Sequence, residues 1–236
     1  MRALAAALRL LYPRVCPFCG DAIPLGQRVC PKCTLQSHRI SDTINRKGVL
    51  EAQGETLPYA EGDIAPFWYE GPVRRAITAY KFSARLGSAE VLAAHMADTC
   101  RAVLPLEEIE GVVCVPGRPR QRRERGFGHS ELLAQHLARE LDIPYLKGAL
   151  VKLFDTPYQH RLGLPARREN LLGAFEVADR AAVRGKTLLL CDDIVTTGGT
   201  AAECAKMLRV RGCERVYFCA AAAAGKERNR EANGKL

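Results

Sequence analysis

The segment LLLCDDIVTTGGT, residues 188–200, joins an apolar run to two adjacent acidic residues and a Thr/Gly-rich turn. The run at 187–191 shows no polar alternation, which is typical of a central parallel strand covered by helices on both faces. Ligands of such sheets bind at the carboxyl ends of the strands. We therefore expect Asp192 and Asp193 to lie at the ligand-binding edge of a parallel sheet.

The turn that follows the two acids has the composition of a phosphate site. Glycines let several backbone N–H groups converge, and the start of the next helix adds positive potential there. Threonine hydroxyls add further hydrogen-bond donors. The predicted phosphate-binding residues are Thr196, Thr197, Gly198, Gly199 and Thr200.

The acid pair indicates a second part of the ligand. Carboxylates repel a phosphate, so Asp192 and Asp193 suit vicinal hydroxyls, or Mg²⁺ that bridges a polyphosphate. A ribose 5′-phosphate would satisfy both the acids and the turn. The alternative is a plain strand–turn–helix connection with an acidic N-cap, which needs only one acid. No G-x-x-x-x-G-K-[ST] occurs, and no strand is followed by G-x-G-x-x-G.

Around this segment, residues 63–225 alternate strand-like runs with helical patterns, which predicts an α/β domain with a mostly parallel sheet flanked by helices. Strands are expected at 65–69, 111–116, 149–153, 173–177, 186–191 and 215–220, and helices from 73 and at 88–103, 129–141 and 200–211. Residues 37–62 are polar and weakly patterned, and they predict a linker or irregular extension. Residues 226–236 predict a disordered basic tail.

Residues 1–36 are expected to hold a short helix and a metal site. Four cysteines have the spacing C-x₂-C-x₁₀-C-x₂-C: Cys16, Cys19, Cys30 and Cys33. Two C-x₂-C pairs can together complete a tetrahedral Cys₄ site for structural Zn²⁺. So short a region has little hydrophobic core without a metal. Two redox pairs or plain core cysteines are the alternatives.

Composition narrows the class of protein. The 236 residues carry a net charge of +9, which indicates anionic partners. The other six of the ten cysteines lie in apolar or helical contexts, as core cysteines of a reducing cytoplasm do. No apolar run reaches membrane-spanning length. The N-terminal stretch predicts an amphipathic helix, because its leucines recur at helical spacing and no signal-peptide cleavage site follows.

The segment 188–200 resembles the signature by which type I phosphoribosyltransferases bind phosphoribosyl pyrophosphate (PRPP), and the chain as a whole resembles the ComF/GntX family. Three further segments carry this resemblance: YEGPVRRAITAYKF (69–82), VVCVPGRPRQRRERGF (112–127) and TPYQHRLGLPARRENLLGAF (156–175). It implies a type I phosphoribosyltransferase fold with an N-terminal zinc ribbon. Two features depart from the family: Gly128-His129 replace the usual Asn-Gln, and 37–62 lacks a second set of paired cysteines.

The resemblance implies a pentosyltransferase that uses PRPP with Mg²⁺. In this reading Asp192 and Asp193 are the catalytic pair that holds the ribose hydroxyls, and 196–200 binds the 5′-phosphate. Candidates for binding the pyrophosphate, or for a mobile hood over the site, are Lys81, Arg125, Gln159, Arg167 and Arg168. The acceptor of the phosphoribosyl group is not identified by the sequence.

The arginine-rich loop at 118–126 leaves a second function open. Such a charge run can be a solvated loop or a nucleic-acid contact, with Arg120, Arg122 and Arg123 as candidates. The resemblance also implies a role in DNA uptake during natural transformation, with single- or double-stranded DNA and competence-machinery proteins as partners. The alternative hypothesis is therefore a non-catalytic sensor of PRPP or a nucleotide that binds nucleic acid.

Overall fold

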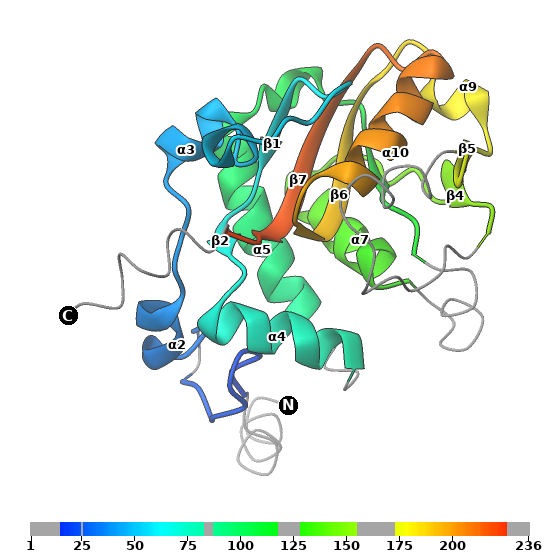
Figure 1. The fold of residues 1–236 in the computed structure, drawn as a ribbon. Coiled ribbons are helices and arrows are strands. Elements are labelled where there is room, and N and C mark those ends of the chain that lie inside the picture. Colours follow the sequence, from blue (N-terminus) through cyan, green and yellow to red (C-terminus); the bar gives the residue numbers. More distant parts are fainter. Residues whose placement is uncertain (1–14, 25, 83–86, 118–127, 155–172, 226–236) are drawn as a thin grey trace, which may run out of the picture.

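A parallel sheet forms the centre of the computed structural model, which describes residues 15–24, 26–82, 87–117, 128–154 and 173–225 (Figure 1). Its strands are β1 (Gly62–Ile64), β2 (Phe67–Trp68), β3 (Gly111–Cys114), β6 (Thr187–Val195) and β7 (Arg215–Ala223). Their order is β1-β7-β6-β3, with β2 also pairing with β7, and all these pairings are parallel. The expected parallel α/β architecture is confirmed.

Strand β6 lies inside the sheet and is covered on both faces. Cys191 is in register with Cys114 of β3 and Cys219 of β7. Leu188 and Leu190 belong to one buried apolar cluster, whereas Leu189 and Cys191 belong to the other. The uninterrupted apolar run therefore reflects alternation between two cores.

Helices occupy both faces of the sheet. Helices α5 (Gly87–Val103) and α7 (His129–Leu141) pack on each other and on one face, and α10 (Gly199–Val210) packs on the other. Helix α4 (Gly71–Phe82) contacts α5. Smaller helical elements are α2 (Pro31–Gln36), α3 (Asp42–Lys47), α9 (Arg180–Val183), η1 (Glu51–Gln53) and η2 (Leu106–Glu108). The predicted strands at 149–153 and 173–177 form a separate antiparallel pair beside α10, β4 (Leu150–Lys152) and β5 (Phe175–Val177).

The direction of chain progression reverses between β3 and β6. From β3 the chain passes through α7 to Tyr145, which bridges in parallel to Val112 at the outer edge. From β6 it passes through α10 to β7, on the opposite side. The carboxyl ends of β3 and β6 thus flank a topological switch point, where open α/β sheets bind their ligands.

Residues 37–62 are folded, in place of the linker or irregular extension that their weak pattern predicted. They form α3 and η1, and the side chain of Leu50 is fully buried. Two buried polar side chains attach the segment to β1 and its end. Asn45 Oδ1 accepts a hydrogen bond from Ala65 N at 2.9 Å, and Asp63 Oδ2 accepts one from Leu50 N at 2.6 Å. Polar anchors of this kind have no hydrophobic periodicity, so the pattern did not indicate them. The division at residue 62 stays a prediction.

We predict that Leu50→Ala lowers the free energy of unfolding by about 2–5 kcal/mol, because it opens a cavity in a closed core. The matched control is Leu35→Ala, whose parent side chain is 85% exposed and whose effect should stay within about 0.5 kcal/mol. Urea unfolding of both variants measures the difference. An equal, small effect of the two substitutions would show that 37–62 is not part of the core.

Candidate functional site

Asp192 and Asp193 lie where β6 reaches the switch point. Asp193 is buried, with 9% of its surface exposed, and Asp192 is half-buried. Asp192 Oδ1 accepts hydrogen bonds from the backbone N–H of Asp193 at 2.8 Å and from Ser130 Oγ at 2.9 Å. Ser130 belongs to the first turn of α7, so the helix that follows β3 helps to hold the acid pair.

Lys81 supplies the positive charge of this site. It lies in the last turn of α4, and its Nζ is 2.7 Å from Asp193 Oδ1. Burial lowers the pKa of Lys81, but the charge of Asp193, the hydrogen bond to it and the charges of Asp192 and Tyr69 together outweigh this effect and leave the pKa above its usual value. Lys81 was one of the candidates for contacting pyrophosphate, and that stays a prediction; the structure places its ammonium group on a carboxylate of the acid pair.

The electrostatics of Asp192 differ from those of an ordinary surface aspartate. Burial and the charge of Asp193 raise the pKa of Asp192 to about 7, although Lys81 and the hydrogen bonds to its carboxylate oppose the shift. Asp192 therefore exchanges its proton near neutral pH. A carboxylate with this property can accept or donate a proton during a reaction.

The turn between β6 and α10 begins helix α10 with a glycine in the left-handed region, and its role as a phosphate site stays a prediction. Gly198 has a φ of 75° and is the N-cap of α10. A Cβ at this position would lie 2.6 Å from Leu50 Cδ1, so glycine is required both by the backbone and by the contact. Thr196 is exposed and Thr197 is partly exposed, and both can reach a ligand. The unpaired N–H groups that begin any α-helix point out of this end of α10.

Two residues that sequence reasoning left unassigned support the acid pair. The buried Tyr80 donates its hydroxyl hydrogen to the carbonyl oxygen of His129. The rings of these residues meet edge to face, with centroids 5.2 Å apart. Tyr80 thus fixes the start of α7, where Ser130 lies. The available sequence signals were that Tyr80 is adjacent to Lys81 and that Ser130 lies in the first turn of the helix that follows the arginine-rich loop.

The remaining candidates lie outside the described residues. These are Arg120, Arg122, Arg123, Arg125, Gln159, Arg167 and Arg168. Their proposed contacts with pyrophosphate or nucleic acid stay predictions.

The N-terminal cysteines form one compact cluster. The Sγ atoms of Cys16, Cys19, Cys30 and Cys33 all lie within 4.8 Å of one another. Cys19 Sγ and Cys30 Sγ are 3.6 Å apart, close to the ~3.8 Å expected between thiolates in a tetrahedral zinc site with Zn–S bonds of about 2.3 Å. Backbone N–H groups of Cys30 and Cys33 point at sulfur atoms of the cluster. The geometry fits a Cys₄ zinc site.

The protonation of these thiols also fits a metal. Burial opposes ionisation of Cys16, but hydrogen bonds from backbone N–H groups lower its pKa to about 7. For Cys33, burial and the neighbouring sulfur atoms raise the pKa. Four thiolates cannot lie this close together without a cation, because each charge disfavours the next. A bound Zn²⁺ would provide that cation.

Known protein families contain domains similar to both parts of this chain, the one with the acid pair and the one with the cysteine cluster. A model of the phosphoribosyl transferase domain matches residues 128–235, and a model of the double zinc ribbon domain matches residues 7–46. The DNA utilization protein YhgH of Escherichia coli K12 is 30% identical over 205 residues, which cover 86% of this chain and 87% of the relative. Competence protein F of Haemophilus influenzae is 35% identical over 108 residues, 45% of this chain and 47% of that protein. The chain belongs to the ComF family.

Solved structures similar to this ComF family protein include phosphoribosyltransferases. The glutamine PRPP amidotransferase of B. subtilis, complexed with ADP and GMP, is 24% identical, with a TM-score of 0.38 over 56% of this chain and 26% of that one. The Leishmania tarentolae HGPRT-ase in complex with GMP is 15% identical, with a TM-score of 0.31 over 58% of this chain and 67% of that one. The ComF family chain has the type I phosphoribosyltransferase fold with an N-terminal zinc ribbon. Within its described residues, every helix is too short or too polar to cross a membrane.

We predict that the purified protein contains one zinc ion per chain, measured by plasma mass spectrometry. Cys33→Ser should lose most of this metal, because three thiolates bind zinc less tightly than four. Cys114→Ser, which changes a half-buried cysteine outside the cluster, should retain it. Equal zinc contents in the two variants would contradict the assignment of the cluster.

A second prediction follows from the raised pKa of Asp192. Between about pH 4, where an unfolded aspartate ionises, and about pH 7, folded Asp192 keeps a proton that the unfolded chain releases, so its contribution to stability is lost as the pH rises. Asp192→Asn should therefore gain stability relative to wild type as the pH rises from about 5 to about 8. Urea unfolding at both pH values measures this gain. The control Asp98→Asn, at an exposed carboxylate, should show no such trend, and a pH-independent effect of Asp192→Asn would refute the shift.

Proposed function

We propose that this ComF family protein is a phosphoribosyltransferase that binds PRPP with Mg²⁺ and transfers its phosphoribosyl group to an acceptor. The observation that supports this most directly is the acid pair at the switch point, immediately before the glycine-capped start of α10. The two features are adjacent in the chain, so one ribose 5-phosphate can contact both. The matching phosphoribosyl transferase domain model, residues 128–235, includes both features.

In this proposal the residues of the chain bind and orient the sugar. The carboxylate of Asp193, which is paired with Lys81, accepts hydrogen bonds from the ribose hydroxyls. Residues 196–200 and the first N–H groups of α10 hold the 5′-phosphate. Asp192, held by Ser130 and able to exchange a proton near neutral pH, takes up the proton of the incoming nucleophile.

The oxygen atoms of the acid pair also fit Mg²⁺, which binds through one or two carboxylates together with substrate phosphates. Bound with the pyrophosphate, Mg²⁺ would neutralise the charge that develops on the leaving group. Lys81 limits how much negative charge the pair itself presents, so the metal would be held mainly by the substrate.

A second candidate function rests on the charge of the chain and on its relatives. The net charge is +9, and the relatives carry the names DNA utilization protein and competence protein. In this alternative the same pocket senses PRPP or a nucleotide without catalysis, and Arg120, Arg122 and Arg123 contact DNA. Competence-machinery proteins would be further partners, and the free, buried cysteines suit a cytoplasmic location.

The deciding measurement is pyrophosphate release from PRPP and Mg²⁺ in the presence of pooled nucleobases and amines. We predict turnover by the wild type and a loss of at least about 100-fold in Asp192→Asn/Asp193→Asn, since the groups that hold the sugar in the transition state are gone. Asp98→Asn, at an exposed site, should behave as wild type.

Calorimetry with PRPP separates the alternatives. If the wild type binds PRPP, loses it in the double variant and releases no pyrophosphate, the sensor function holds. DNA retardation should then depend on Arg120, Arg122 and Arg123 and fall steeply with salt. If PRPP binds equally well to wild type and double variant, both functions are wrong.

A further inference from the structure

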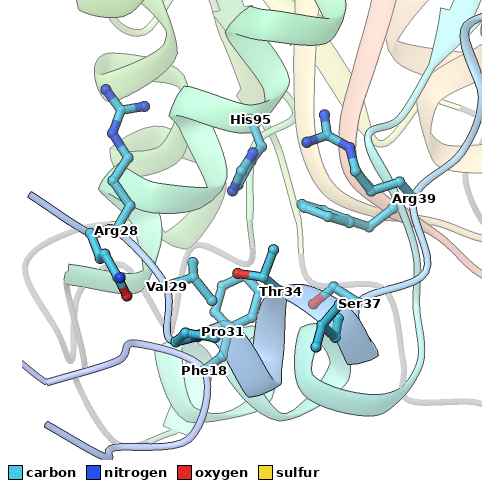
Figure 2. A pocket seen from close by; sticks show the side chains of 11 residues that line it. Phe18, Arg28, Val29, Pro31, Thr34, Ser37, Arg39 and His95 are labelled. Atoms are coloured by element: carbon cyan, nitrogen blue, oxygen red, sulfur yellow. The ribbon is translucent and has the colours of Figure 1, made fainter. Parts of the chain in front are cut away.

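A second pocket, of about 510 Å³, lies beside the zinc ribbon (Figure 2). Its lining comes from the ribbon, from α2 and the residues that follow it, and from β2 and α5. None of the lining residues belongs to the acid pair or to the turn at 196–200. A partner bound in this pocket, which we call the ribbon pocket, would therefore not occupy the proposed transfer site.

Buried aromatic rings form the floor of the ribbon pocket. Phe18 and Phe67 are 3% and 2% exposed, and their rings meet edge to face with centroids 6.4 Å apart. The His95 ring packs on Phe67 in the same manner, at 5.0 Å. These rings support the pocket but offer a partner almost no surface of their own. The groups that a partner can contact are therefore those of the walls and the rim.

The accessible wall of the pocket is apolar and comes mainly from α2. Pro31 and Leu35 are exposed, line the pocket and are four residues apart, which places them on one side of the helix. Leu35 is 85% exposed, more than any other large hydrophobic residue in the described part of the chain. The half-buried Val29 of the ribbon also lines the pocket. An apolar side chain of a partner would remove this surface from water, which is favourable.

Two arginines give the pocket a positive rim. Arg28 and Arg39 have exposed side chains that lie on opposite sides of the pocket (Figure 2). The guanidinium carbon of Arg39 lies 5.5 Å from the centre of the Phe67 ring. Burial lowers the pKa of His95, and the charges of Arg39 and Arg28 lower it further, although Asp98 opposes them. Both cations therefore act on the interior of the pocket.

The acidic side chains near this rim have other partners. Glu70 pairs with His38, and Asp98 pairs with Arg101. Within the described residues, no ion pair includes Arg28 or Arg39. The pocket thus combines apolar surface with positive charge that the described protein does not neutralise.

The terminal segments of the chain do not supply the missing negative charge. Residues 1–14 contain three arginines and no acidic residue, and residues 226–236 contain four basic and two acidic residues. A second copy of the chain carries the same net charge of +9 and would be repelled. The charge of the rim therefore favours a different, acidic partner.

We propose that the ribbon pocket is a docking site for an acidic peptide segment of a partner protein. A large apolar side chain of the segment packs against Leu35 and Val29, and carboxylates on either side of it pair with Arg28 and Arg39. Arginine suits this role because its planar fork can bind a carboxylate through two parallel hydrogen bonds. The phosphates of a nucleic acid would also match the arginines, but they would leave the apolar wall in water.

The test begins with selection of peptides from a random phage-displayed library on the full-length, zinc-loaded protein. We expect the enriched sequences to carry a large apolar residue flanked by Asp or Glu. An enriched peptide is then synthesised with a fluorescent label and titrated by anisotropy. If no sequence is enriched, or if the enriched sequences are basic, the proposal is wrong.

Variants of the pocket connect this binding to the named residues. Arg28→Gln/Arg39→Gln should weaken the peptide at least about tenfold, because charge-assisted hydrogen bonds are lost. Leu35→Ala should weaken it about tenfold through lost apolar burial. The matched control is Arg184→Gln/Arg209→Gln, which makes the same change in net charge at exposed positions and should bind as the wild type does.

Zinc content and circular dichroism should show that all of these variants are folded. A folded variant of the ribbon pocket that binds the peptide as tightly as the control does would contradict the proposed site.

A double-mutant cycle tests the charge pairing itself. A peptide with Asn and Gln in place of its Asp and Glu should bind the wild type at least about tenfold more weakly than the acidic peptide. Arg28→Gln/Arg39→Gln should bind the two peptides equally, because the groups that distinguish them are gone. Additive losses would show that the carboxylates do not meet these arginines and would overturn the proposal.

Two further measurements test other occupants. Displacement of the peptide by a single-stranded oligodeoxyadenylate, with oligomer binding lost in Arg28→Gln/Arg39→Gln, would assign the pocket to nucleic acid. A wild-type dimer in analytical ultracentrifugation that Leu35→Ala dissociates would assign it to a second copy of the chain. We expect neither result, and either would overturn the proposal. None of these experiments contains PRPP, so their outcome is independent of the proposed transfer reaction.

Discussion

Two like charges at the end of one buried strand are the constraint around which this molecule is organised. Asp192 and Asp193 would repel each other and resist burial if nothing compensated for them. The compensation comes from two helices: Lys81 of α4 lies on Asp193, and Ser130 of α7 donates to Asp192. Both helices pack together with α5 on one side of the fold. The geometry of the acid pair therefore depends on the packing of that layer.

The turn at 196–200, the predicted phosphate site, is supported from the opposite face of the sheet. Gly198 has no room for a side chain because Leu50 packs against it, and Leu50 is in turn fixed by the bond from its N–H to Asp63. Burial raises the pKa of Asp63, and backbone N–H groups of Leu50 and Val49 oppose the shift. The segment 37–62 thus supports the turn through the contact of Leu50 with Gly198. Each half of the candidate site is held by a different core, and β6 joins them.

The sequence predicted the elements whose pattern is local. Helix α7 has the predicted bounds, β6 contains the strand predicted at 186–191 except for Lys186, and the cysteine spacing gives a cluster that fits zinc. It could not predict contacts set by tertiary packing, such as Ser130 on Asp192 or Leu50 beneath Gly198. Lys81 illustrates the limit of the sequence. Its positive charge indicates an anionic partner, but that partner can be a carboxylate of the protein as well as the pyrophosphate of a ligand.

The zinc ribbon is part of the same packing. A segment of this size cannot bury a core of its own, so Cys16, Cys30 and Cys33 join the apolar cluster on the α5 face and Ser88 Oγ donates to the carbonyl of Pro17. Helix α2, which begins between the last two cysteines of the cluster, contacts α4 (Figure 1). The last turn of α4 carries Tyr80 and Lys81. The helix that carries the counter-charge of the acid pair therefore packs on the helix that contains Cys33 of the cysteine cluster. A ribbon held by zinc is a rigid support for α4, and its geometry bears on the site through that one helix.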